Sequence, residues 1–470
     1  LEGIDIFQTP ISAVHTRAII DPDYAVKLTG KQGRNTFGLL LASDNAPGSF
    51  SEEEQSDPDV FSRIEKFVDK NAYVGVLRLK RDIGKESSLG LLATSYNFIE
   101  KHNQLGGVDG RFRLDPKTVF SFQALGTTSR RFFFDQGIGD AIYRTGNGAA
   151  YAFNLSRAGR NWVTEVDGVG RTRDYRADVG FTPRIDTNQQ SFFIRYGSDP
   201  KPKATFISWR VHNFTHVNYD WRGRMQVAES ENFANLSFSR ESFIGFGYER
   251  AYERLFEEEF GLVRTGARSG AFFGPDPERS SHKHHFFVNG GITPSKKYSF
   301  FARTTYRQGH FDFDFGAGRK FPRVSPAALL DPEAPLDPGP GNLLELGASI
   351  VYQPTSALRT SLDYTRNRLV RHDTGRVAFD DNIYSLRSTY QFTRFLFTRA
   401  RIDYTTLSSR MRGQFLLGWA PNPGTSFYAG YNDDLTRNGF SPFSGHLEPG
   451  FRRNGRTFFI KMAYLFQYGL

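Results

Sequence analysis

The chain ends in Arg456-Thr457-Phe458-Phe459-Ile460-Lys461-Met462-Ala463-Tyr464-Leu465-Phe466-Gln467-Tyr468-Gly469-Leu470, and this stretch decides the predicted fold. Successive side chains of a β-strand point to opposite faces, so one face here would be wholly apolar. That face carries Phe458, Ile460, Met462, Tyr464, Phe466 and Tyr468, whereas the other is mixed and includes Lys461. A tilted strand crosses a bilayer with roughly 9–11 residues. The stretch therefore predicts the closing, lipid-facing strand of an outer-membrane barrel, with an edge strand of a soluble β-sandwich as the alternative.

The composition favours strands and turns. The 470 residues include 46 Phe, 21 Tyr and 46 Gly but only 3 Met, and aromatic residues and glycine are typical of strands and turns respectively. The sequence has no run of 18 or more apolar residues, which excludes a transmembrane helix but not a barrel. Because no change of composition divides the chain, we predict a single barrel domain over residues 1–470, with residues 1–23 as a lead-in.

Charge and cysteine content narrow the choice of partners. The absence of cysteine excludes disulfides and thiolate metal sites. A net charge of +10 could indicate nucleic acid, but the basic residues are spread among acidic ones and no nucleic-acid-binding motif accompanies them. We therefore predict no nucleic-acid partner. The sequence opens with Leu1-Glu2-Gly3 and without a signal peptide, so on this interpretation it is a fragment or a processed form.

Charged residues recur on alternate positions of the predicted strands. After a predicted hairpin of residues 24–30 and 35–43, the residues Tyr73, Leu77 and Leu79 alternate with charged ones. Charges are costly on the lipid side of a barrel strand and tolerated on the side of a watery lumen. The predicted lumen-lining residues are Arg78, Lys80, Asp82, Arg399, Arg401, Asp403 and Lys461.

Long polar insertions alternate with tight turns in the C-terminal half. The insertions at 266–281, 321–341 and 436–455 are separated by turns at 294–295, 353–355 and 421–424. Outer-membrane barrels have this asymmetry between long extracellular loops and short periplasmic turns. At about 20 residues per strand and connection, the length allows roughly 22–26 strands. Residue patterns alone give 23, including one strand at 175–181, although an even number is expected.

Several short segments, in order, resemble a known family. They are Leu1-Glu2-Gly3, Lys27-Leu28-Thr29-Gly30-Lys31, Leu77-Arg78-Leu79-Lys80-Arg81-Asp82 and Asp178-Val179-Gly180-Phe181-Thr182-Pro183-Arg184. Together they resemble a bacterial outer-membrane β-barrel domain of unknown function. In longer proteins that domain follows a domain like the family-9 carbohydrate-binding modules. The resemblance implies the fold and the location, and it implies that the sugar-binding-like domain would precede Leu1 and is absent here.

Other clusters could carry chemistry. His282 and His284 would share a strand face and could bind zinc or copper, but no third ligand is evident and a wet strand tip beside a loop is the favoured interpretation. The acidic run 52–59 and the pair Asp312 and Asp314 could hold Ca²⁺ or could simply be solvated. Ser208 and His212 could belong to a hydrolase, although no motif ties them together. We therefore predict no catalytic residue, no metal site and no cofactor.

The sequence as a whole predicts a large antiparallel transmembrane β-barrel in a bacterial outer membrane, in contact with lipid and lipopolysaccharide. The first functional hypothesis is a channel or a transport or secretion component, with saccharides as candidate solutes. The second is a structural anchor with a plugged lumen for a carbohydrate-binding domain or a partner complex. An outer-membrane enzyme is a third hypothesis, which no motif supports.

Overall fold

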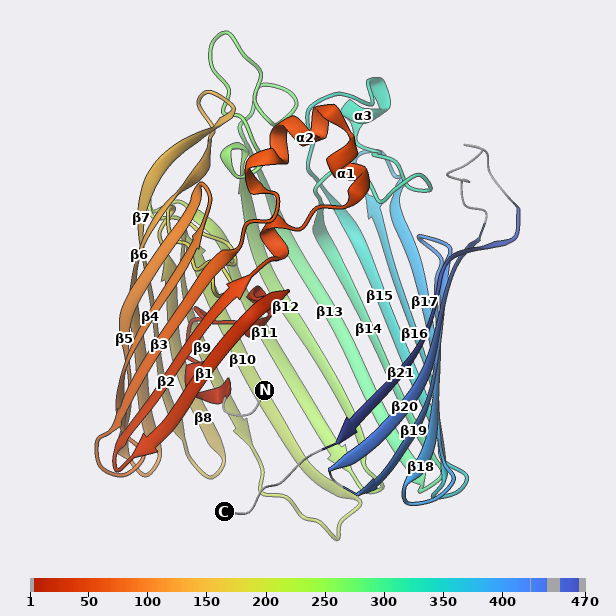
Figure 1. Ribbon diagram of the computed structural model, residues 1–470. Coiled ribbons are helices and arrows are strands. Elements are labelled where there is room, and N and C mark those ends of the chain that lie inside the picture. The colour runs from red at the N-terminus through yellow and green to blue at the C-terminus, as the bar shows by residue number, and fades with distance from the viewer. Residues whose placement is uncertain (1–3, 423, 438–448, 465–470) are drawn as a thin grey trace. The chain divides into compact units, whose positions relative to one another are not determined.

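A computed structural model describes residues 4–422, 424–437 and 449–464, and within these residues the chain forms 21 strands in one sheet (Figure 1). Consecutive strands from β1 to β9 and from β12 to β21 pair in antiparallel register. The strands are β1 (Pro22–Gln32), β2 (Asn35–Asp44), β3 (Ala72–Asp82), β4 (Ser88–Phe98), β5 (Lys101–Asp115), β6 (Thr118–Asp135), β7 (Asp140–Ala158), β8 (Trp162–Arg171), β9 (Thr187–Gly197), β10 (Phe206–Tyr219), β11 (Met225–Phe238), β12 (Ser242–Phe256), β13 (Glu278–Ser295), β14 (Tyr298–Asp312), β15 (Gly339–Tyr352), β16 (Leu358–Arg371), β17 (Val377–Gln391), β18 (Leu396–Thr405), β19 (Arg410–Asn422), β20 (Thr425–Arg437) and β21 (Phe451–Tyr464).

The antiparallel all-β fold agrees with the sequence prediction, and the strand count in the described residues lies just below the expected range. Two features account for the difference. The strands are longer than expected, reaching 19 residues in β7. The predicted strand at 175–181 is wrong, because this segment belongs to an irregular connection between β8 and β9. Three of its apolar residues, Tyr175, Ala177 and Val179, are buried, whereas Phe181 is 65% exposed.

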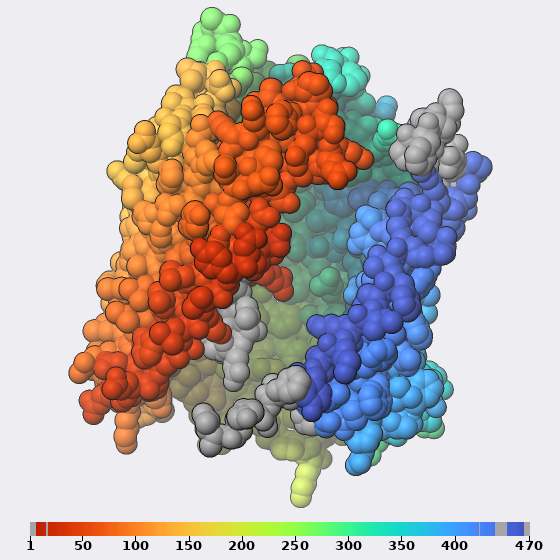
Figure 2. All heavy atoms as spheres, in the orientation of Figure 1, coloured from red at the N-terminus to blue at the C-terminus, as the bar shows by residue number. Residues whose placement is uncertain are grey.

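The helices are short and lie in the connections. They are α1 (Glu52–Ser56), α2 (Pro58–Ile64) and α3 (Pro326–Leu330), with single 3-10 turns at Ile4–Phe7, Thr16–Ala18, Ala46–Gly48, Glu65–Phe67 and Glu257–Glu259. Helices α1 and α2 belong to the insertion between β2 and β3 and form a mass beyond the ends of these strands (orange, Figure 2). Among the described residues, none of the helices has the length and apolar character to cross a membrane.

Long insertions and short turns alternate from β12 to β16, as predicted for the C-terminal half, whereas the connections from β16 to β20 are all short. The predicted insertion at 436–455 lies partly outside the described residues. Strands β1 and β2 meet at the two-residue turn Gly33-Arg34, where Gly33 has a φ of +59° that glycine adopts without steric cost. The next connection, from β2 to β3, is the long insertion with α1 and α2. The insertions between β12 and β13 and between β14 and β15 lie at one end of their strands, which we call the long-loop end. The turns between β15 and β16 and between β17 and β18 lie at the other end, which we call the short-turn end.

The chain divides into two compact units. Unit 1 contains Leu1–Tyr196, Asn213–Ser230 and Glu258–Val263, and unit 2 contains Gly197–His212, Glu231–Glu257 and Arg264–Leu470. Both are built from long antiparallel strands. They differ in what lies on the side of the sheet that is opposite the exposed apolar side chains.

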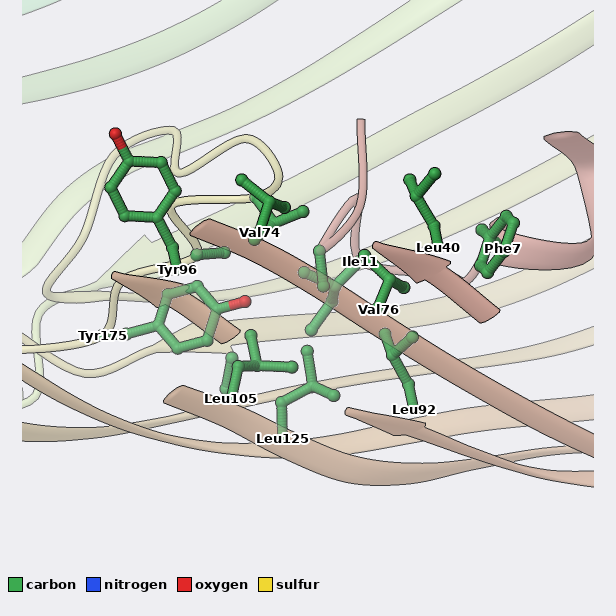
Figure 3. Packing of buried hydrophobic residues seen from close by; sticks show 14 of the residues in the cluster. Phe7, Ile11, Leu40, Val74, Val76, Leu92, Tyr96, Leu105, Leu125 and Tyr175 are labelled. Carbon is green, nitrogen blue, oxygen red and sulfur yellow. The ribbon is translucent and has the colours of Figure 1, made fainter. Parts of the chain in front are cut away.

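In unit 1, one side of β2–β7 is covered by the chain itself. This covered face carries Leu40, Val76 and Leu105, which are in register across the strands and are at most 7% exposed. Figure 3 shows Phe7 and Ile11 of the lead-in, and Tyr175 of the β8–β9 connection, packed on these side chains. Phe7 and Ile11 are 2% exposed and Tyr175 is 0% exposed. The largest hydrophobic cluster therefore lies on this face.

In unit 2, the strands β16–β21 have an exposed apolar face and a polar face. In β21, which borders the unit (dark blue, Figure 2), Phe458, Ile460, Met462 and Tyr464 are 58–70% exposed. Large apolar side chains with this exposure have an unfavourable surface in water and suit a lipid environment. The predicted lipid-facing residues Phe466 and Tyr468 lie outside the described residues.

Candidate functional site

The polar face of unit 2 is organised in cross-strand rows. Residues directly opposite each other in a sheet share a face, and so do residues two apart in one strand. One row places Arg387 opposite Arg401, which is opposite Gln414. A second row, nearer the short-turn end, runs through Arg359, Thr389, Arg399, Leu416, Gly430 and Phe459. A third runs through Asp363, Ser385, Asp403, Arg412 and Asp434.

These rows line two hollows in unit 2. The first has a volume of about 480 Å³ and is bordered by Asp363, Arg387, Arg401, Asp403 and Arg412, among other residues. The second has a volume of about 430 Å³, shares Arg387 and Arg401 with the first, and adds Arg399. Volumes of this order suit a small ligand. The predicted residues Arg399, Arg401 and Asp403 are therefore brought together on one charged surface.

Lys461 also lies on the polar face. It stands opposite Tyr428, which stands opposite Gly418 and then Phe397. The rings of Phe397 and Tyr428 meet edge to face with centroids 6.4 Å apart, and a Cβ on Gly418 would lie 2.4 Å from the Phe397 ring. Glycine at position 418 thus makes room for an aromatic patch at the short-turn end. That these residues line a lumen stays a prediction.

The other predicted lumen residues belong to unit 1 and have different surroundings. Arg78 is 2% exposed and makes a two-pronged ion pair with Asp109, in which its Nη2 lies 2.8 Å from Oδ1. The guanidinium passes over Gly90, where a Cβ would lie 2.5 Å from it. Lys80 is exposed, and Asp82 pairs with Lys31 at 2.7 Å near the β1–β2 turn. The structure therefore does not join these residues into one site.

The segments that cover unit 1 were missed by sequence reasoning. The amide of His15 donates to the carbonyl of Val179 at 2.8 Å, and the amide of Phe181 donates to the carbonyl of Ser12 at 2.8 Å. The lead-in and the β8–β9 connection are thus hydrogen-bonded to each other. On the sheet below them, the buried Asn103 accepts from the amide of Asp178 at 3.1 Å.

Ion pairs attach the same connection to the strands. Arg144 of β7 donates twice to Asp174 at 2.8 and 2.9 Å, and Arg131 of β6 donates to Asp178 at 3.0 Å. The hydrogen bonds from Arg144 lower the pKa of the Asp174 carboxyl below its usual value, against an opposing effect of burial. The ionised Asp174 carboxylate, paired with Arg144, therefore helps to hold the β8–β9 connection on unit 1.

The side chains of the histidine cluster contact aromatic and acidic neighbours. Although His282 and His284 share a strand face, His284 contacts the hydroxyl of Tyr248 at 2.8 Å and His282 packs on the ring of Tyr252. His285 lies on the opposite face, 3.0 Å from Glu249. Among the described residues, no group of three or more potential ligands is positioned to hold a metal ion.

The acidic and hydrolase candidates have other roles. In the acidic run, Glu54 and Ser51 form a capping box for α1, and Asp57 caps α2, so carboxylates here stabilise helix starts. His212 lies 3.2 Å from Glu231 and packs on Phe233.

Buried ion pairs hold the long-loop end of unit 2. Arg371 is 1% exposed and binds Asp312 at 2.9 Å and Asp373 at 2.7 Å. Burial alone would raise the pKa of Asp373, but the hydrogen bonds from Arg371 hold it below its usual value. In the insertion between β14 and β15, the buried Asp314 accepts hydrogen bonds from Arg323 at 2.7 Å and from Ser325 at 2.8 Å. The acidic pair Asp312 and Asp314 is therefore structural.

Comparisons with known proteins identify the fold. No protein-family model matches the sequence, and no curated protein matches it. Among solved structures, a mutant of the ferric enterobactin receptor PfeA from Pseudomonas aeruginosa has a TM-score of 0.54 at 9% sequence identity, covering 94% of this chain and 78% of that one. The copper transporter OprC has a TM-score of 0.51 at 11% identity, covering 93% and 74%. The chain therefore has an antiparallel β-barrel fold of the bacterial outer membrane.

Proposed function

We propose that the chain is a transport component of the bacterial outer membrane and that solutes pass along the polar face of unit 2. The observation that carries this proposal is the contrast between the two faces of β16–β21. One face exposes Phe458, Ile460 and Met462 as lipid would require. The other offers arginine, aspartate and amide side chains around hollows of about 480 and 430 Å³.

The similar structures support transport as the class of activity. One is named as a copper transporter and the other as a ferric enterobactin receptor. Their identities of 11% and 9% carry no information about the solute of this chain. The proposal is accordingly one of a transport protein rather than of an enzyme. Its membrane partners are lipid and lipopolysaccharide, which the apolar face would contact.

Saccharides are the candidate solutes that the family resemblance suggests. On the polar face, the ring of Phe397 meets that of Tyr428 and lies against the guanidinium of Arg399. Aromatic surfaces beside polar groups suit the alternating apolar and hydroxyl surfaces of sugars. Block of an ionic current by added malto-oligosaccharides would support this part of the proposal, and an unchanged current would remove it.

Single-channel recording of the purified barrel in a planar bilayer tests the proposal. We expect discrete current steps whose size increases with salt concentration. The control is the same preparation unfolded by heating, which should give none. Silence from a preparation that shows the heat-dependent gel mobility of a folded barrel would contradict a conducting channel.

A plugged anchor is the second candidate function, and the covered face of unit 1 favours it. Residues 4–18 and 172–186 occupy space on the side of the sheet away from the exposed apolar side chains. On this proposal the barrel would hold a carbohydrate-binding domain or a partner complex at the membrane without conducting. Silence in the bilayer from folded protein is its expected result, and steady conduction would contradict it.

A further inference from the structure

The arginines on the polar face of unit 2 are only partly balanced by carboxylates. Arg387 stands directly opposite Arg401, and Arg359 and Arg399 flank Thr389 in the neighbouring row. Like charges directly opposite each other in a sheet destabilise it. A sheet that keeps four arginines so close together has a surface that attracts negative charge.

Ion pairs neutralise only part of this cluster. Arg401 pairs with Asp403 at 2.7 Å, and Arg387 lies 3.7 Å from Asp363. Among the described residues, no carboxylate pairs with Arg359 or Arg399. Arg399 instead stacks on the ring of Phe397, 4.8 Å from its centroid. A cation–π contact of this kind orients the guanidinium and leaves its charge uncompensated.

The surroundings of Arg399 supply further hydrogen-bonding groups. The hollow of about 430 Å³ is lined by Arg387, Arg399 and Arg401 together with Gln414 and Asn432. Gln414 stands opposite both Arg401 and Asn432. Three guanidinium groups and two amides thus converge on one space of the size of a small ligand.

We propose that this hollow binds a small, multiply charged oxyanion, carried by phosphate or carboxylate groups. The planar guanidinium presents paired N–H donors that match the two oxygens of a carboxylate or phosphate. With Arg387 and Arg401 on adjacent strands, one ligand can meet both. This inference deepens the proposed transport function, because it assigns the class of solute that the polar face would select.

Direct binding tests the site without requiring conduction. Titration calorimetry of the folded barrel in detergent, at low ionic strength, would use pyrophosphate and citrate in separate experiments. We expect saturable binding of at least one of them, weakened about tenfold or more in the R399Q/R401Q double variant. A preference for pyrophosphate would indicate phosphate groups as the natural ligand, and a preference for citrate would indicate carboxylates.

A matched control removes the same charge from the other face. Arg366 and Arg368 lie on β16 with the opposite side-chain parity to Arg359 and pair with Asp380 at 2.7 and 3.5 Å. The R366Q/R368Q variant should bind both anions as the parent chain does. Absence of binding to the parent chain, or equal affinity in R399Q/R401Q, would overturn the proposal.

Reversal potentials in a salt gradient separate this inference from the proposed function. We expect an anion-selective current that pyrophosphate or citrate blocks, with the selectivity reduced in R399Q/R401Q. Conduction without anion preference and without anion binding would contradict the anion-binding site but not the proposed channel function. Anion binding in a chain that does not conduct would contradict the proposed channel function but not the anion-binding site.

Discussion

Units 1 and 2 are built from the same kind of strand and use the second face of that strand in opposite ways. In unit 1 this face carries Leu40, Val76 and Leu105 and is covered by the chain. In unit 2 it carries Arg387, Arg401 and their neighbours around open hollows. The difference teaches that alternation separates the two faces of a strand without fixing what covers each of them. The chemistry of the second face decides whether protein or solvent covers it.

The largest expected effect is the loss of stability caused by a charge placed in the covered face. Leu92 is 0% exposed, and Leu92→Asp would bury an unpaired carboxylate, which should reduce the free energy of unfolding by more than about 4 kcal/mol. Leu416→Asp, on the polar face opposite Arg399, should change it by less than about 1 kcal/mol. Urea unfolding in lipid vesicles measures both. Equal losses would mean that the two faces do not differ as described.

Ion pairs on the two faces should also differ in strength. Asp109→Asn breaks a pair whose side chains are 3% and 14% exposed, and loss of one buried partner costs about 3–5 kcal/mol. Asp403→Asn breaks a pair whose side chains are 48% and 27% exposed, and such pairs contribute about 0–1 kcal/mol. The same urea titrations compare the variants. A similar loss in both would show that exposure does not distinguish the pairs.

A single methyl group should weaken the covering contact. In Gly148→Ala the new Cβ would lie 2.3 Å from the backbone nitrogen of Tyr175, and such overpacking costs about 1–3 kcal/mol. Gly413→Ala in unit 2 has open space around its Cβ and should change stability by no more than about 0.5 kcal/mol. Limited proteolysis within residues 172–186 should be faster in Gly148→Ala only. An unchanged cleavage rate would contradict the close packing.

The smallest expected effect is a pH dependence confined to the cover. Because the folded pKa of Asp174 is lowered, its contribution to stability is complete above the ordinary carboxyl pKa of 3.8 and is lost as the pH falls through the lowered value. Amide exchange in residues 172–186 should therefore accelerate, after correction for its intrinsic pH dependence, between neutral pH and pH below 3.8. Asp174→Asn should exchange faster already at neutral pH and should lose this dependence. If amide exchange in Asp174→Asn kept this pH dependence, a titrating group other than Asp174 would be its cause.

Alternation made much of the fold predictable. The apolar face of Phe458, Ile460 and Met462 follows from a period of two in the sequence, and so does the common face of Arg399, Arg401 and Asp403. The position of the hairpin turn at Gly33 follows from turn chemistry. These are local properties, and local sequence specifies them.

The cover on unit 1 could not be found in the same way. Residues 175–181 alternate like a strand, yet Tyr175, Ala177 and Val179 are buried, and the segment contacts Asn103 and the lead-in, which are distant in sequence. One signal was available. In β3 the second face, with Val74 and Val76, is as apolar as the lipid-facing side with Tyr73 and Leu77. A strand that is apolar on both faces needs a second apolar partner, although its sequence does not say which segment supplies it.

The anchored insertions of unit 2 have a consequence for recognition by other proteins. Arg371, Asp314 and Arg323 fix the segments around them through buried ion pairs. A binding protein that meets ordered loops avoids the entropy loss of organising them, so its affinity depends mainly on complementarity. An antibody raised against the segments around these residues would therefore meet a preformed epitope, and rigid-body docking would describe the complex well.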